Sequence, residues 1–143
     1  AGLLQFGSWA TSIDRGARLA AGDFNGDGRM DFAVGDGTEV TLYLADARLG
    51  YEMGTVLSPA GGATWTTAVD LNLDGHLDLA VAGTVLELYP GRGDGTFGPS
   101  QTLPLHHAAK IVHAADFDGD GKPDLLTAGD QGSWLALWRN ELP

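Results

Sequence analysis

The chain has 143 residues, the length of a single domain, and its hydrophobic fraction of 43% excludes a disordered or fibrous protein. Nineteen acidic against eight basic residues give a net charge of −11, which argues against nucleic acids and anionic membranes as partners. The absence of cysteine excludes disulfides and zinc–thiolate sites, and 22 glycines favour strands joined by tight turns.

Three acidic segments align without gaps along the chain. They begin at Asp23, Asp70 and Asp116, which lie 47 and 46 residues apart. Such self-similarity is typical of repeat proteins. We therefore read the chain, 1–143, as one repeat segment with an N-terminal piece, 1–14, followed by three repeat units at 15–61, 62–108 and 109–143.

The same order of elements is predicted in every unit. A β-prone stretch precedes each acidic segment, over 17–22, 64–69 and 110–115. Another follows each acidic segment, over 32–34, 79–81 and 125–127. Alternation with a period of two then predicts a third strand, over 40–44, 86–89 and 135–138. A fourth strand begins near an aromatic residue in the first two units, over 50–57 and 95–103. The acidic segment is thus a loop between the first two of four strands.

The third unit lacks its last strand, since only residues 139–143 follow the third one. A match lies at the other end of the chain, where Gln5-Phe6-Gly7-Ser8 resembles Thr96-Phe97-Gly98-Pro99. We therefore expect residues 1–14 to form the closing strand of a blade whose other three strands come from a last unit.

Four-stranded units of this length predict an all-β fold, a β-propeller with three blades per chain. Propellers typically have roughly four to eight blades, so a ring of three would be sterically tight. We expect a homodimer that forms a six-bladed ring, in which each N-terminal strand completes the last blade of the other chain. The alternative is that the chain is half of a longer propeller.

Oxygen-bearing side chains recur at positions 1, 3, 5 and 9 of each acidic loop. Hard carboxylate and amide oxygens suit Ca²⁺, and glycine at position 6 permits the sharp turn. The backbone carbonyl of position 7 would add a ligand, so the side chain there can point to solvent. We predict three structural Ca²⁺ ions per chain, held by Asp23, Asn25, Asp27, Arg29 and Asp31; by Asp70, Asn72, Asp74, His76 and Asp78; and by Asp116, Asp118, Asp120, Lys122 and Asp124.

Two other interpretations of the loops were weighed. An EF-hand needs Glu at position 12, where this chain has Val34, Val81 and Thr127. Simple hairpin turns fit Asp36-Gly37 and Asp94-Gly95 but not three nine-residue copies in register. Transition metals are disfavoured because no cysteine or paired histidine enters the loops. Calcium is therefore the predicted cofactor.

With its D-x-[DN]-x-D-G-x-x-D loops, the chain resembles the FG-GAP or VCBS repeats of integrin-α-like β-propellers. Phe6-Gly7 and Phe97-Gly98 match the Phe-Gly of that pattern, whereas Tyr51-Glu52 departs from it and no Gly-Ala-Pro follows. The resemblance implies a calcium loop between the first two strands of each blade and a secreted, extracellular binding or assembly module.

Three function classes come into question: an enzyme, a lectin and a binding or assembly module. No catalytic constellation stands out: no serine lies in a nucleophile elbow, and His106, His107 and His113 have no counterparts in the other units. We predict a non-enzyme that binds a protein or glycan ligand. The alternatives are a propeller-type lectin, for which Trp65 and Trp134 are the candidate sugar-stacking residues, and a non-catalytic repeat region of a secreted enzyme.

Overall fold

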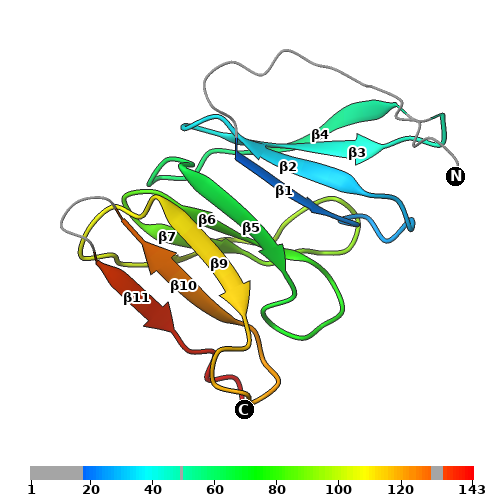
Figure 1. The fold of residues 1–143 in the computed structure, drawn as a ribbon. Helices are drawn as coiled ribbons and strands as arrows, with labels where there is room; N and C mark the ends of the chain where they lie inside the picture. Colours follow the sequence, from blue (N-terminus) through cyan, green and yellow to red (C-terminus); the bar gives the residue numbers. More distant parts are fainter. Residues whose placement is uncertain (1–17, 49, 130–133) are drawn as a thin grey trace, which may run out of the picture.

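The computed structural model describes residues 18–48, 50–129 and 134–143, and these residues form an all-β structure (Figure 1). The all-β prediction is confirmed, since no helix occurs in the described ranges. The strands are β1 (Arg18–Gly22), β2 (Asp31–Gly35), β3 (Val40–Ala45), β4 (Tyr51–Leu57), β5 (Trp65–Val69), β6 (Asp78–Ala82), β7 (Leu86–Tyr89), β8 (Gln101–Leu103), β9 (Ile111–Ala115), β10 (Asp124–Ala128) and β11 (Leu135–Trp138).

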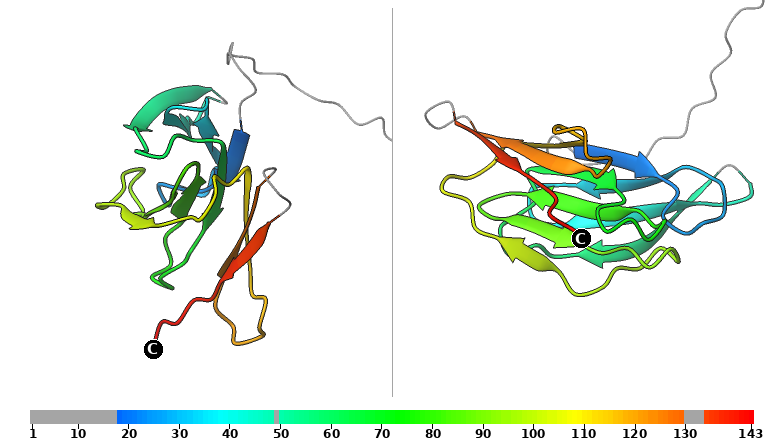
Figure 2. Two further views of the ribbon diagram at one scale, coloured as in Figure 1. Left: turned by 90° about the vertical axis from the view of Figure 1, so that its left-hand side faces the viewer. Right: turned by 90° about the horizontal axis from the view of Figure 1, so that it is seen from below.

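The strands form three antiparallel sheets, each built from consecutive strands. Sheet 1 is β1-β2-β3-β4, sheet 2 is β5-β6-β7-β8 and sheet 3 is β9-β10-β11. Each strand therefore pairs with its neighbour in sequence, as short turns allow. The sheets stack side by side in chain order, with sheet 2 in the middle (Figures 1 and 2). This arrangement agrees with three adjacent propeller blades.

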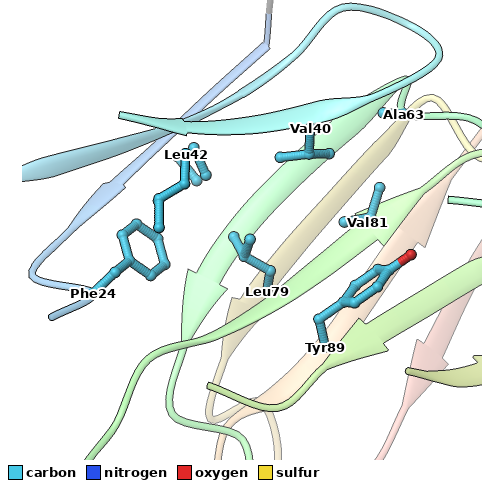
Figure 3. Close-up of a cluster of buried hydrophobic side chains, with 9 residues drawn as sticks. Phe24, Val40, Leu42, Ala63, Leu79, Val81 and Tyr89 are labelled. Carbon is cyan, nitrogen blue, oxygen red and sulfur yellow. The ribbon is translucent and has the colours of Figure 1, made fainter. Parts of the chain in front are cut away.

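The sheets contact one another chiefly through their first strands, β1 with β5 and β5 with β9. Between sheets 1 and 2, Val40 and Leu42 of β3 pack against Leu79 and Val81 of β6, and all four side chains are buried (Figure 3). Because alternate residues of a strand point to opposite faces, the intervening residue of β6, Ala80, faces sheet 3. The central sheet therefore contributes to two cores.

The second core lies between sheets 2 and 3. Ala82 and Leu86 of sheet 2 pack there with Val112 and Leu125 of sheet 3. Trp138 packs against this core, and its indole N–H donates to Thr127 Oγ1 at 3.0 Å. Trp138 thus occupies the strand position that Tyr43 and Tyr89 occupy in the first two sheets.

One predicted strand is shorter than expected. The fourth strand of the second unit is predicted over 95–103, but β8 begins at Gln101. Phe97 forms only an isolated bridge with Gly91. Pro99 has no N–H to donate to a ladder, which explains why regular pairing starts beyond it.

Sheet 3 has three strands in the described part of the chain, with β11 at its edge. The predicted closing strand, 1–14, lies outside the described residues. Among the residues that are described, no helix is long and apolar enough to cross a membrane.

Candidate metal centre

The acidic loops join the first and second strand of each sheet and lie at the same end of all three sheets (Figure 1). Their position-9 residues, Asp31, Asp78 and Asp124, are the first residues of β2, β6 and β10. The other acidic positions precede these strands and are largely exposed. Each loop therefore combines an open rim, positions 1 to 8, with a buried base, position 9.

The first aspartate of each loop organises the rim. Asp23 accepts hydrogen bonds from the backbone N–H groups of Gly26, Asp27 and Gly28 at 2.8 to 3.1 Å. Desolvation raises the pKa of Asp23, but these N–H groups, Gly28 foremost, outweigh it and hold the pKa below its ordinary value. Asp70 and Asp116 accept equivalent bonds from Gly75 and Gly121 at 2.8 and 2.9 Å. The backbone curls around this carboxylate in all three loops.

The third and fifth positions close the rim. In the first loop, Asn25 accepts from the N–H of Asp27 at 3.1 Å, and its own amide donates to the Asp27 carboxylate at 2.8 Å. The second loop repeats both bonds through Asn72 and Asp74. In the third loop, which has Asp118 instead of Asn, one oxygen each of Asp116, Asp118 and Asp120 lies within 4.8 Å of the others. In the third loop the side chains at positions 1, 3 and 5 are thus gathered around one point, and in the first two loops those at positions 3 and 5 bond to each other.

Two residues of each rim have a left-handed backbone. The glycine at position 6 has φ of 80°, 88° and 86° in the three loops. Position 4 is also left-handed, with Gly26, Leu73 and Gly119 at 73°, 61° and 83°. Leu73 is the only non-glycine residue with positive φ in the described chain. The sequence indicated the turn at position 6 but not the one at position 4.

The base aspartates have a role that the sequence did not reveal. Asp78 accepts the N–H of Leu71 at 2.9 Å on one oxygen and that of Gly91 at 2.8 Å on the other. Asp31 bonds likewise to Phe24 and Ala45, and Asp124 to Phe117 and Asn140. Burial raises the pKa of Asp78, against the lowering effect of these N–H groups. Each base aspartate ties its loop to the end of the third strand, at Ala45, or to the segment just after it, at Gly91 and Asn140.

The side chains at position 7 are exposed or half-buried, and two of them pair with the rim. Arg29 pairs with Asp27 at 2.5 Å and donates to the carbonyl of Ala45 at 3.1 Å. Lys122 pairs with Asp120 at 3.7 Å and donates to the Leu142 carbonyl. The cause is electrostatic, because the rim concentrates negative charge beside these cations. The His76 ring lies against Gly93, where a Cβ would meet its Nδ1.

The donor set fits a hard divalent cation. The gathered rim atoms are carboxylate and amide oxygens, and neither cysteine nor a second histidine lies among them, which is the chemistry that Ca²⁺ selects. Positions 1, 3 and 5 would hold the ion directly. The base oxygens are already engaged by backbone N–H groups but retain further lone pairs. A bound ion would supply charge neutralisation and no reaction chemistry.

The other candidate residues are dispersed. Trp65 is half-buried on β5, with the Arg18 guanidinium 5.5 Å from its ring centroid and the His113 ring at 6.3 Å. Trp134 packs against the second core and lies 6.2 Å from the ring of His107. Both indoles therefore pack against protein, which leaves less of their faces for a sugar. His106, His107 and His113 are exposed.

The comparisons with known proteins agree with the loop geometry. The model of the FG-GAP-like repeat matches residues 23–81 and again 70–127, so each match spans two consecutive acidic loops. Mouse integrin alpha-IIb is 31% identical over 166 aligned positions, which cover 87% of this chain and 16% of the integrin. The chain spans about a sixth of the length of that relative. These matches point to a repeat module of integrin-like type. The chain belongs to the FG-GAP-like repeat family.

Proposed function

We propose that the chain is a calcium-stabilised β-propeller module that serves in binding or assembly outside the cell. The observation that carries this proposal is the rim that recurs in three loops: the backbone curls around the carboxylate at position 1 in each, and in the third loop oxygens of Asp116, Asp118 and Asp120 lie within 4.8 Å of one another. Each rim offers oxygen donors with no competing soft ligand. One Ca²⁺ per rim gives three ions per chain.

Charge supports a structural role for the ion. The rims gather carboxylates, and like charges this close repel one another. A cation bound only by the folded loop would stabilise the fold by mass action. Arg29 and Lys122 already offset part of this charge in the first and third loops. The second loop has His76 at that position, so it should depend most on the ion.

The extracellular location rests on two supports. Its relative is an integrin α chain, and open loops of this kind suit the millimolar calcium outside cells. The bound ligand stays open between a protein and a glycan. The alternatives are a lectin and a non-catalytic region of a secreted enzyme. A glycan array probed with the unaltered chain and with Trp65→Ala and Trp134→Ala variants would test the lectin.

The test is a calcium titration by isothermal calorimetry on chelator-treated protein. We expect three sites per chain and a rise in melting temperature with calcium. Asp74→Asn should remove one site, whereas Asp36→Asn removes the same charge from a turn outside the loops and should remove none. An Asp74→Asn protein that still binds three ions would contradict the proposal.

A further inference from the structure

The outer face of sheet 3 is the first observation that points to a partner. Leu135 and Leu137 of β11 are 68% and 46% exposed. Val40 and Leu42 occupy the same two positions of β3 and are each 1% exposed, because sheet 2 covers them. The face that joins one sheet to the next is therefore present on sheet 3 and uncovered.

The opposite end of the stack has the complementary face. In sheet 2 the face turned toward sheet 1 carries Leu79 and Val81, which are buried by that sheet. The corresponding face of sheet 1 carries Leu19, Met53 and Val56, which are 58%, 70% and 45% exposed. The two ends of the stack thus expose the two complementary faces of a sheet-to-sheet interface. The chain forms this kind of interface twice internally.

A pocket between sheets 2 and 3 is the second observation. It has a volume of about 590 Å³. Its lining includes the repeat counterparts of six residues of the first core, namely Leu71 for Phe24, Leu88 for Leu42, Pro90 for Leu44, Leu103 for Leu57, Leu125 for Leu79, and Trp138 for Tyr89. In the first core, the six counterpart residues pack together with Phe97. The Phe97 ring meets the Phe24 ring edge to face, with the ring centroids 6.0 Å apart. The pocket therefore lies at the place that the ring of Phe97 occupies in the first core.

The course of the chain after β11 supports this equivalence. Asn140 N donates to Asp124 as Gly91 N donates to Asp78. The backbone therefore leaves β11 as it leaves β7, toward the place where Phe97 and β8 would follow. In the sequence, Phe6-Gly7 is the counterpart of Phe97-Gly98. These residues lie outside the described part of the structure, in the segment that leads into β1.

We propose that a second copy of this chain docks on sheet 3, with Phe6 of the partner subunit in the pocket and the partner's N-terminal segment along the open edge of β11. The partner's sheet 1 then covers Leu135 and Leu137. Sheet 2 separates sheet 1 from sheet 3 within one chain (Figure 1), so the segment next to β1 comes to sheet 3 from another copy. Two such contacts related by a twofold axis close a ring and leave no open face.

The first test is the mass in solution by light scattering on a sizing column, in calcium. The unaltered chain should elute at twice its chain mass. Leu137→Asp should weaken the dimer roughly 100-fold or more, because a carboxylate would be buried unpaired. Ala60→Asp is the control, an exposed apolar residue in the connection between β4 and β5 that gains the same charge, and should leave the dimer intact. A monomeric unaltered chain, or a dimer unaffected by Leu137→Asp, would overturn the proposal.

The second test fixes the register and the source of the strand. Counting from Phe97 and Phe6, Thr102 corresponds to Thr11, and the Glu87–Thr102 pair corresponds to Ala136–Thr11. The chain has no cysteine, so mixing the single variants Thr11→Cys and Ala136→Cys should give a covalent dimer on oxidation. The double variant, with both cysteines in one chain, is the comparison. If only this variant forms a crosslink, and it forms within one chain, then the chain's own N-terminal segment pairs with β11 and the proposed second copy is wrong.

Both tests are independent of the calcium proposal. Leu137→Asp should keep three calcium sites by calorimetry, because Leu137 lies opposite Leu126 inside β10 and belongs to no rim. Loss of calcium binding without loss of the dimer would count against the metal centre alone. If the unaltered chain binds calcium but is a monomer, the result would count against the docking proposal alone.

Discussion

The buried base and the open rim of each acidic loop differ although both consist of aspartates. The base residues Asp31, Asp78 and Asp124 are 0%, 3% and 1% exposed and give both oxygens to backbone N–H groups. The rim aspartates are half-buried or exposed, and in the third loop their oxygens gather around one point. A single nine-residue motif thus contains a part that holds the fold together and a part free to hold an ion.

The largest expected effect comes from the base. Asp78→Ala would leave the N–H groups of Leu71 and Gly91 without their acceptor, at about 1 to 3 kcal/mol for each buried group. We expect the free energy of unfolding to fall by roughly 3 kcal/mol in urea titrations, in EDTA as well as in calcium. An effect that appears only in calcium would mean that Asp78 acts mainly as a ligand.

The next effect concerns the rim. Asp27→Asn, Asp74→Asn and Asp120→Asn together should abolish the rise in melting temperature that calcium gives, worth about 2.7 kcal/mol per site at 100 times the dissociation constant. In EDTA the same triple variant should be as stable as the unaltered chain or more so, since repulsion is relieved. Equal losses with and without calcium would remove the distinction between rim and base.

Backbone conformation gives a smaller effect on the rim. Gly75 has φ of 88° and open space where a Cβ would be, so Gly75→Ala adds only conformational strain, about 1 to 2 kcal/mol. Leu73 has φ of 61°, and Leu73→Gly should stabilise the loop by about 1 kcal/mol. Thermal unfolding of both variants measures this. If both substitutions shifted the melting temperature in the same direction, the backbone φ at these positions would not control the stability of the rim.

The smallest effect tests an acidic turn outside the loops. Asp36 accepts the N–H groups of Glu39 and Thr38, which hold its pKa below the ordinary 3.8. Its contribution, about 1 kcal/mol or less, is therefore complete above pH 3.8 and disappears as the pH falls through the lower folded pKa. The stability difference between the unaltered chain and Asp36→Ala should be present at pH 7 and vanish near pH 2. A difference independent of pH would contradict this.

The sequence anticipates features that repeat and misses features that depend on contacts between elements. Alternation in 40–44 and 86–89 and the triple acidic motif were enough to predict the strands and the loops between them. The role of Asp78 was not accessible, because its partner Gly91 is 13 residues away and meets it only through sheet pairing. The return of Arg29 to Asp27 depends likewise on local charge, and the late start of β8 follows from a single proline.

The burial of β6 has a consequence for how the molecule opens. All five of its residues are buried, and it is paired on both sides within the central sheet. Amide hydrogens there can exchange with solvent only when β6 separates from β5 and β7 and loses its cover on both faces, so their exchange should report global unfolding. Those of β11, at the edge of sheet 3, should exchange through local fraying in the monomeric Leu137→Asp variant and be protected in the dimer. The order of deuterium uptake along the chain would thus trace a gradient of cooperativity that runs outward from one strand.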